Sequence, residues 1–372
     1  MTDLGLPRSS EELTPVWLDS ALRAAGVIDS ATVTSVRLES LEGGTGASVT
    51  RVKLDYDRDE PGAPATLIAK LPSPAGIAAR HIMTKLGMYV REARFYDELA
   101  GLVDIRTPRC YFNALDDSTQ TGVLLLEDLT VGRLGQSGIT FDDAVLVLDR
   151  LARFHAGMWD HPGLREMDWL DWGDRSDSYL FLTRAWWSEI LRDSSHAIDE
   201  GALGIIEAAI ANTPRAMSLL SQPPLTLVHG DLWPPNLAFD DGADDPVTAF
   251  DWQLVARMRP GFDVGYFLDV TSDFSNIKDT EEWFEETGEL ILGYHDALIA
   301  QGAGGYSVAL LQRDRRLSYV YTLTADVWSQ AHLKGLLGSA YEEGLRQWSS
   351  KVAERTARLG LTEHLERDLR DL

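Results

Sequence analysis

Three polar side chains in the second half of the chain have the types and the spacing that phosphoryl transfer requires. A largely apolar run, residues 225–228, leads into a His-Gly-Asp turn that ends at Asp231, and Asn236 follows five residues later. A second such run, residues 247–250, leads directly to Asp251. The reaction needs a carboxylate that accepts the proton of the acceptor hydroxyl, and oxygen ligands that hold magnesium on the nucleotide phosphates. We therefore predict Asp231 as the catalytic base, and Asn236 and Asp251 as the magnesium ligands.

Each of these features is weak evidence when it is taken alone. An Asp at the end of a strand is usually a turn former or a helix cap, and a His-Gly-Asp turn can arise by chance. The joint order of strand, His-Gly-Asp, four residues, Asn and a second strand that ends in Asp is far rarer. We therefore interpret the set as a catalytic loop followed by a metal-binding loop.

The segment His-Gly-Asp-Leu-Trp-Pro-Pro-Asn, followed by Phe-Asp-Trp-Gln, resembles the aminoglycoside phosphotransferase and choline kinase-like superfamily. Within it, the resemblance is strongest to the ecdysteroid-kinase-like branch. It runs from about residue 41 to residue 268 and is most specific over residues 229–251. The resemblance gives Asp231, Asn236 and Asp251 the same three roles, and it implies ATP and Mg²⁺ as cofactors.

Two further positions follow from this resemblance. Asp263, in Pro-Gly-Phe-Asp-Val-Gly-Tyr-Phe, matches an aspartate that braces the catalytic loop in the family. After the metal-binding aspartate, protein kinases have Phe-Gly, whereas this chain has Trp252 and Gln253. No glycine hinge remains there, so the sequence does not favour a regulatory flip of this segment.

A kinase also needs a lysine that faces the phosphates and a glutamate that orients it. Lys70 lies on an expected strand, on the same face as Thr66 and Ile68. On the helix that follows, Glu92 shares its face with Met88, Tyr89, Phe95, Tyr96 and Leu99. A carboxylate on an apolar face is unfavourable unless it is paired. We predict a Lys70–Glu92 ion pair at the catalytic centre, the alternative being a lysine that extends from an edge strand into solvent.

The nucleotide-binding residues are expected in two further segments of the N-terminal part. Gly44, Gly46 and Ser48 lie at a glycine-rich hairpin tip, whose backbone N–H groups could contact phosphates. Glycine-rich tips of this kind are also common in ordinary β-hairpins, so this one indicates a phosphate-binding loop only because it comes before Lys70. In the kinase interpretation, Glu127 and Leu129 offer backbone groups to adenine.

The order of expected elements changes near residue 129. Expected strands are Val33–Leu41, Val49–Tyr56, Thr66–Leu71 and Val123–Leu126, with one helix at Met83–Leu99. Beyond them, helices are expected over residues 140–159, 179–192, 200–220, 281–300, 307–333 and 341–359, with a β-loop-β stretch at 225–267. We predict an α+β, bilobal, protein-kinase-like fold. Residues 1–127 would form a nucleotide-binding lobe with a small antiparallel sheet and one helix. Residues 128–372 would form a large helical lobe with the catalytic loop and the acceptor site.

The composition is that of a folded protein, with 44% apolar and 25% charged residues among 372. The net charge of -24 and the lack of a Lys/Arg cluster argue against a nucleic-acid partner. The chain shows no signal peptide or membrane span, and Cys110 is its only cysteine. We therefore expect a cytoplasmic protein with no membrane partner.

Three functions remain open at this point. The first is a small-molecule kinase with a hydroxyl acceptor, since the short interval between Asp251 and Asp263 has no room for the activation segment of a protein kinase. The second is an inactive, nucleotide-binding scaffold. The third is a metal-dependent hydrolase, which would need more His and Asp ligands than one His-Gly-Asp turn supplies. The acceptor is unknown, and eleven tryptophans favour an apolar or mixed molecule over a polycationic one.

Overall fold

The computed structural model describes residues 5–41, 47–72, 83–116, 118–129, 132–271 and 280–370, with only the backbone for residues 174–175 and 280–286. The chain divides into two compact units. We call Met1–Leu134 with Leu237–Val255 the strand unit, and Gly135–Asn236 with Ala256–Leu372 the helical unit. The lobe boundary after residue 127 stays a prediction.

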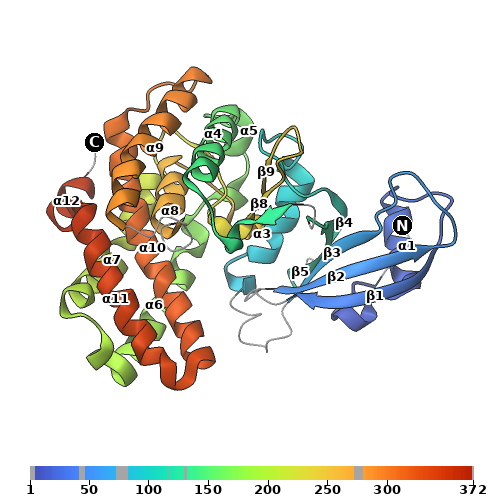
Figure 1. Ribbon diagram of the computed structural model, residues 1–372, viewed down its shortest axis with the longest axis horizontal. Helices are drawn as coiled ribbons and strands as arrows, with labels where there is room; N and C mark the ends of the chain where they lie inside the picture. Colours follow the sequence, from blue (N-terminus) through green and yellow to red (C-terminus); the bar gives the residue numbers. More distant parts are fainter. Residues whose placement is uncertain are drawn as a thin grey trace. The chain divides into compact units, whose positions relative to one another are not determined.

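The main sheet of the strand unit has five strands in the order β1-β2-β3-β5-β4, all paired antiparallel (Figure 1). These strands are β1 Val33–Leu41, β2 Ala47–Tyr56, β3 Thr66–Pro72, β4 Cys110–Asp116 and β5 Thr121–Glu127. Along β3, Leu67, Ala69 and Leu71 are buried. Because successive side chains of a strand point to opposite faces, Lys70 lies on the other face, as predicted.

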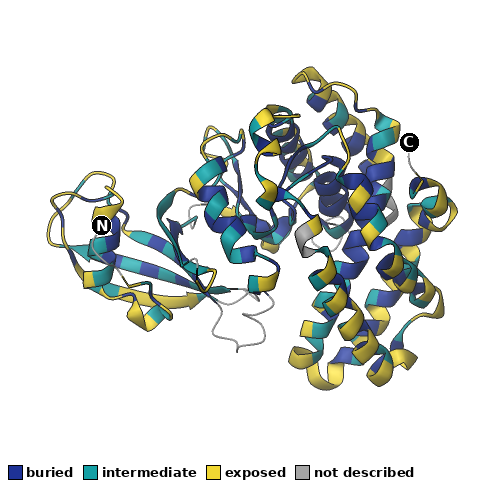
Figure 2. Ribbon diagram, turned by 180° about the vertical axis from the view of Figure 1, so that it is seen from behind, coloured by how far each residue is buried: buried dark blue, intermediate teal, exposed yellow. Residues whose placement is uncertain are grey.

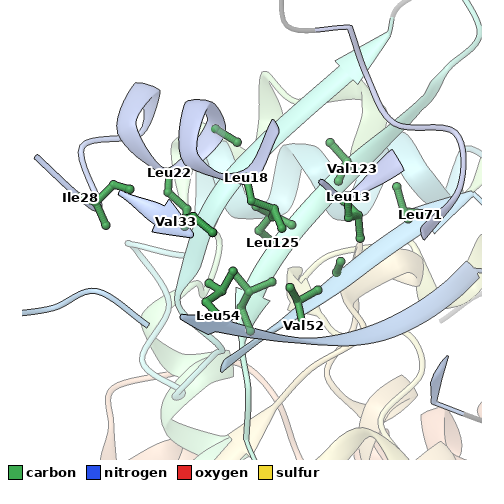
Figure 3. Close-up of a cluster of buried hydrophobic side chains, with 13 residues drawn as sticks. Leu13, Leu18, Leu22, Ile28, Val33, Val52, Leu54, Leu71, Val123 and Leu125 are labelled. Atoms are coloured by element: carbon green, nitrogen blue, oxygen red, sulfur yellow. The ribbon is translucent and has the colours of Figure 1, made fainter. Parts of the chain in front are cut away.

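Helix α1, Pro15–Ala24, covers the buried face of this sheet. The helix begins where the Thr14 hydroxyl accepts a hydrogen bond from the Trp17 N–H, and a proline occupies its first position. Its apolar side chains pack onto those of the strands, as Figure 3 shows for Leu18 and Leu125. Neither α1 nor β4 was among the elements expected from the sequence.

The helix expected at residues 83–99 is broken into pieces. Gly87 adopts a left-handed conformation with φ 67°, after which α3 runs over Met88–Arg94. The chain then continues as a π-helical turn, η2, over Phe95–Leu99. A short 3₁₀ turn, η1 Ser10–Glu12, precedes α1 at the start of the unit.

A second, three-stranded antiparallel sheet belongs to the strand unit. Its order is β6-β8-β9, from β6 Arg133–Leu134, β8 Leu237–Phe239 and β9 Val247–Ala249. β8 begins directly after Asn236, and β9 ends two residues before Asp251. A 3₁₀ turn, η7 Trp252–Leu254, then ends this part of the chain. The sheet therefore fixes where the predicted metal-binding aspartate emerges.

The helical unit consists of helices around a two-stranded sheet, β7 Thr226–Val228 with β10 Ala256–Met258. Its helices are α4 Phe141–Gly157, α5 Pro162–Arg165, α6 Gly173–Ser194, α7 Glu200–Leu220, α8 Gly261–Thr271, α9 Thr280–Ala300, α10 Val308–Leu337, α11 Tyr341–Arg358 and α12 Leu361–Asp368. Its 3₁₀ turns are η3 Gly135–Ser137, η4 Asp168–Leu170, η5 Ser195–Ala197, η6 Pro234–Asn236 and η8 Gly338–Ala340. The expected capping box at the start of α4 is confirmed, because Thr140 and Asp143 exchange hydrogen bonds.

Helix α8 is almost wholly buried within this unit. Of its eleven residues, ten are buried, and it packs along α10. The contact depends on Gly265, since a Cβ there would lie 2.8 Å from Ser318 Cβ and 3.0 Å from Arg315 Cα. Figure 2 shows buried segments in dark blue on the inner sides of the helices, with exposed residues in yellow outside. Within the described ranges, no helix combines the length and the apolar character needed to cross a bilayer.

Candidate active site

The strand unit brings together three of the predicted site residues, Lys70, Glu92 and Asp251. Lys70 Nζ lies 2.6 Å from Glu92 Oε1, 2.7 Å from Glu92 Oε2 and 2.7 Å from Asp251 Oδ1. Lys70 comes from β3, Glu92 from α3 and Asp251 from the turn after β9. The predicted Lys70–Glu92 ion pair is therefore confirmed as a contact. Its contact with Asp251 adds a second carboxylate to the same lysine.

The charged groups of this cluster are mostly buried. The side chains of Lys70 and Glu92 are 13% and 5% exposed. Burial alone would lower the pKa of Lys70, but the charges of Asp251 and then Glu92 outweigh it and raise that pKa. Burial raises the pKa of Glu92 to about 7, with Lys70 opposing the rise and Asp251 adding to it. One lysine thus faces two carboxylates, and this arrangement favours a further cation beside them.

The backbone at Asp251 has an uncommon conformation. Its φ is 68° and its ψ is 60°, a left-handed conformation that Asp tolerates better than most residues. The next residue anchors it, because the buried Trp252 ring stacks on Phe95 at 4.0 Å and its Nε1 donates to Ala249 O. The Trp that stands where protein kinases have Phe is therefore a core side chain of the strand unit.

The helical unit holds the predicted catalytic base by both of its oxygens. Asp231 Oδ1 accepts a hydrogen bond of 3.0 Å from the Tyr266 hydroxyl, and its Oδ2 accepts one of 3.1 Å from Asn236 Nδ2. Asn236 Nδ2 also donates to the backbone oxygen of Asp231 at 2.9 Å. Asn236 and Asp231 are thus neighbours, as their spacing implied. Tyr266 was not singled out in the sequence.

The loop that carries Asp231 is braced from α8. The Asp263 carboxylate accepts hydrogen bonds from His229 N at 2.7 Å and from Gly230 N at 3.0 Å. Gly230 has φ 86°, which favours glycine at this tight position. The role expected of Asp263 from the family resemblance is therefore confirmed as a set of contacts.

His155 completes the brace from α4. Its Nε2 lies 3.3 Å from Asp263 Oδ2, and its Nδ1 lies 2.7 Å from the Tyr294 hydroxyl. Burial lowers the pKa of His155, although Asp263 opposes the change, so the ring is neutral. Since a carboxylate can only accept, Nε2 carries the proton and Nδ1 accepts from Tyr294.

The predicted metal ligands have the chemistry that magnesium requires. Both hydrogen bonds described for the Asn236 amide use its nitrogen, which leaves its oxygen as the atom to offer to a cation. Asp251 accepts from Lys70 at Oδ1 and has a weaker contact, 3.4 Å, from Gln253 at Oδ2. An amide oxygen and a carboxylate are hard donors that suit magnesium.

The predicted nucleotide-binding residues are described only in part. Gly44 and Gly46 lie outside the described residues, while Ser48 lies on β2, opposite Leu71 of β3. Glu127 ends β5, where it lies opposite Leu67 of β3, and it donates its backbone N–H to Arg109 O at 2.8 Å. Leu129 follows two residues later and is half-buried. Their roles stay predictions.

The carboxylate of Glu127 makes a contact that the sequence did not indicate. It accepts a hydrogen bond from Arg106 at 2.7 Å and another from Arg109 N at 3.0 Å. The side chain of Glu127 therefore has a structural role in the strand unit that does not depend on what its backbone binds.

A model of the phosphotransferase enzyme family (APH) matches residues 41–309. No curated protein matches the chain. Among solved structures, an ethanolamine kinase of Plasmodium vivax is 15% identical with a TM-score of 0.54, over 88% of this chain and 85% of that chain. An amicoumacin kinase in complex with AMP-PNP, Ca²⁺ and its ligand is 13% identical with a TM-score of 0.56, over 94% and 95%. A microcompartment-associated aminopropanol kinase is 15% identical with a TM-score of 0.52, over 95% and 99%. The predicted α+β, kinase-like fold is confirmed by these likenesses.

Proposed function

This chain belongs to the phosphotransferase enzyme family, and from that premise we propose that it transfers the γ-phosphate of ATP to a hydroxyl group of a small molecule. The predicted superfamily is thereby confirmed, while the ecdysteroid-kinase-like branch stays a prediction. Structures of similar fold are described as kinases of ethanolamine, aminopropanol and amicoumacin, and the last holds AMP-PNP, an ATP analogue. They support ATP and a small acceptor for this chain.

The observation that carries the proposal is the buried lysine with two carboxylates. Lys70 contacts both Glu92 and Asp251 within 2.7 Å. In our proposal, Lys70 binds the nucleotide phosphates and Glu92 keeps the lysine in place. Asn236 and Asp251 would hold magnesium. When bound, magnesium neutralises the negative charge of the phosphates.

Asp231 is proposed as the base. The acceptor oxygen forms a bond to the γ-phosphorus while the bond from that phosphorus to the bridging oxygen of ADP breaks. The hydroxyl proton passes to Asp231, which later releases it to solvent. Both oxygens of this ionised carboxylate act as hydrogen-bond acceptors, from Tyr266 and Asn236, which is the state that a base requires.

The acceptor is proposed only as a hydroxyl-bearing small molecule. A screen of magnesium-dependent ATP consumption, with a panel of alcohols, amino sugars and steroids, tests the proposal. We expect at least one acceptor to accelerate ADP formation by the wild-type protein.

The Asp231→Asn variant is the comparison that tests the base. It should bind ATP as the wild type does and lose turnover by about two orders of magnitude or more, because the base acts on the acceptor. Equal turnover in the two proteins would contradict Asp231 as the base. ATP binding without turnover on every member of the panel would instead favour an inactive scaffold.

A further inference from the structure

One residue outside the predicted set touches the proposed base directly. Tyr266 lies on α8, is 8% exposed, and donates its hydroxyl to Asp231 Oδ1 at 3.0 Å. We infer that Tyr266 is a positioning residue that holds the carboxylate of Asp231 in the orientation needed to take the acceptor proton. This inference rests on the proposed role of Asp231 as the base.

The need for such a residue follows from the torsion of the Asp side chain. The terminal torsion of an Asp is broad, so its carboxylate turns easily unless it is held. Here each oxygen has its own donor: Tyr266 on Oδ1 and Asn236 on Oδ2. The two donors come from different elements, α8 and η6, so together they fix the plane of the carboxylate. Removing the hydroxyl of Tyr266 therefore takes away one of the contacts that hold this carboxylate.

Helix α8 contacts the catalytic loop both at its backbone and at the side chain of Asp231. Asp263 fixes the backbone by accepting from His229 N and Gly230 N. Tyr266 follows three residues later, on the same side of the helix, and fixes the side chain of Asp231. One rigid helix thus sets both the path of the loop and the direction of its carboxylate.

The ring of Tyr266 is itself fixed by packing. It lies parallel to the ring of Phe262 at 6.5 Å and beside the ring of Tyr321 of α10 at 6.2 Å. The close approach of α8 to α10 at Gly265 sets the place of the next residue, Tyr266. The hydroxyl is therefore presented to Asp231 by the core of the helical unit.

The hydroxyl of Tyr266 is in the protonated form that can donate a hydrogen bond. Burial, and then the charge of Asp231, raise the pKa of Tyr266 well above its usual value. The hydroxyl stays protonated throughout the neutral range. Tyr266 can therefore donate to the carboxylate but cannot replace it as the base.

The test compares Tyr266→Phe with a matched variant, Tyr179→Phe. Tyr179 is also buried, also packs beside Tyr321, at 5.5 Å, and also has a hydrogen-bonded hydroxyl, 2.9 Å from Thr324 Oγ1. Both changes remove one buried hydroxyl from the same aromatic cluster. Only the change at Tyr266 removes a contact to Asp231.

The readout is magnesium-dependent ADP formation with water as the acceptor, and then with any acceptor found in the screen. We expect Tyr266→Phe to lower kcat by about 10-fold to 100-fold, the range for losing a hydrogen bond to a charged group. Its KM for ATP should not change, and Tyr179→Phe should keep both values. The melting temperatures of the two variants should fall by similar amounts, so a loss of folding would not explain the difference.

A double variant separates this inference from the proposed function. If Tyr266 acts through Asp231, adding Tyr266→Phe to Asp231→Asn should lower kcat no further. An unchanged kcat in Tyr266→Phe, equal losses in both Tyr variants, or additive losses in the double variant would overturn the inference, with Asp231 still the base. Equal turnover by wild type and Asp231→Asn, or no turnover by the wild type, would overturn the proposed function and this inference with it.

Discussion

Replacing Gly265 with alanine should damage both the stability of the helical unit and its catalytic loop. An added Cβ would lie 2.8 Å from Ser318 Cβ, 3.0 Å from Arg315 Cα and 3.1 Å from Arg315 O. Two of these are backbone atoms of α10, which cannot rotate away. Helices α8 and α10 must therefore move apart to admit the methyl group.

The expected loss of stability can be compared with that caused by the same change at a glycine on another helix. Overpacking of a core by a methyl group typically costs about 1–3 kcal/mol, and Ala gains about 1 kcal/mol over Gly in a helix interior. Gly293, on α9, is exposed and has nothing within 4 Å of an added Cβ, so Gly293→Ala carries only the gain. We expect the two variants to differ by about 1–3 kcal/mol in the free energy of unfolding, measured with urea.

The same change should reach the active site. Helix α8 carries Tyr266, whose hydrogen bond to Asp231 is 3.0 Å long, so a small displacement lengthens it beyond useful range. Gly265→Ala should therefore lower kcat while the KM for ATP is kept, and Gly293→Ala should keep both. Equal stability and equal kcat in the two variants would refute the reasoning from α8–α10 packing.

Two further predictions concern the strand unit. The pKa of Glu92 is raised to about 7 in the folded state, above its unfolded value, so the stability from this group is present at low pH and lost as pH rises through about 7. Urea unfolding should therefore show Glu92→Gln to be more destabilised, relative to wild type, at pH 5 than at pH 8, by about 2–3 kcal/mol. A difference that does not depend on pH would contradict the shift. Trp252→Ala removes a fully buried ring stacked on Phe95 and should lower the free energy of unfolding by about 3–5 kcal/mol, a loss that thermal unfolding would reveal and that Trp252→Phe should reduce.

The parts of the site that could be predicted depend on local periodicity. Alternation along a strand put Lys70 on one face, and helical spacing put Glu92 on an apolar face that needs a partner. These two arguments are independent, and the contact at 2.6 Å satisfies both. The brace by Asp263 was reached only through the family resemblance.

Other features depend on contacts that periodicity does not contain. Spacing shows that Asp263 and Tyr266 share a side of α8, but not that this side meets the catalytic loop. β4 is half-buried along its whole length, so it lacks the alternation that marks a strand. The segment Leu237–Val255 belongs to the strand unit although more than a hundred residues of the helical unit precede it. No local sequence pattern indicates this.

The most direct test of the account is the affinity for ATP by calorimetry, with and without magnesium, in wild type and Asp251→Ala. Asp251 is the carboxylate proposed to hold the metal, whereas Asn236 is a neutral ligand that cannot offset the charge of the metal ion. Asp241→Ala, an exposed acid in the same unit, is the control for net charge. The account predicts that magnesium tightens ATP binding in wild type and in Asp241→Ala but not in Asp251→Ala. Equal magnesium dependence in all three proteins would contradict it.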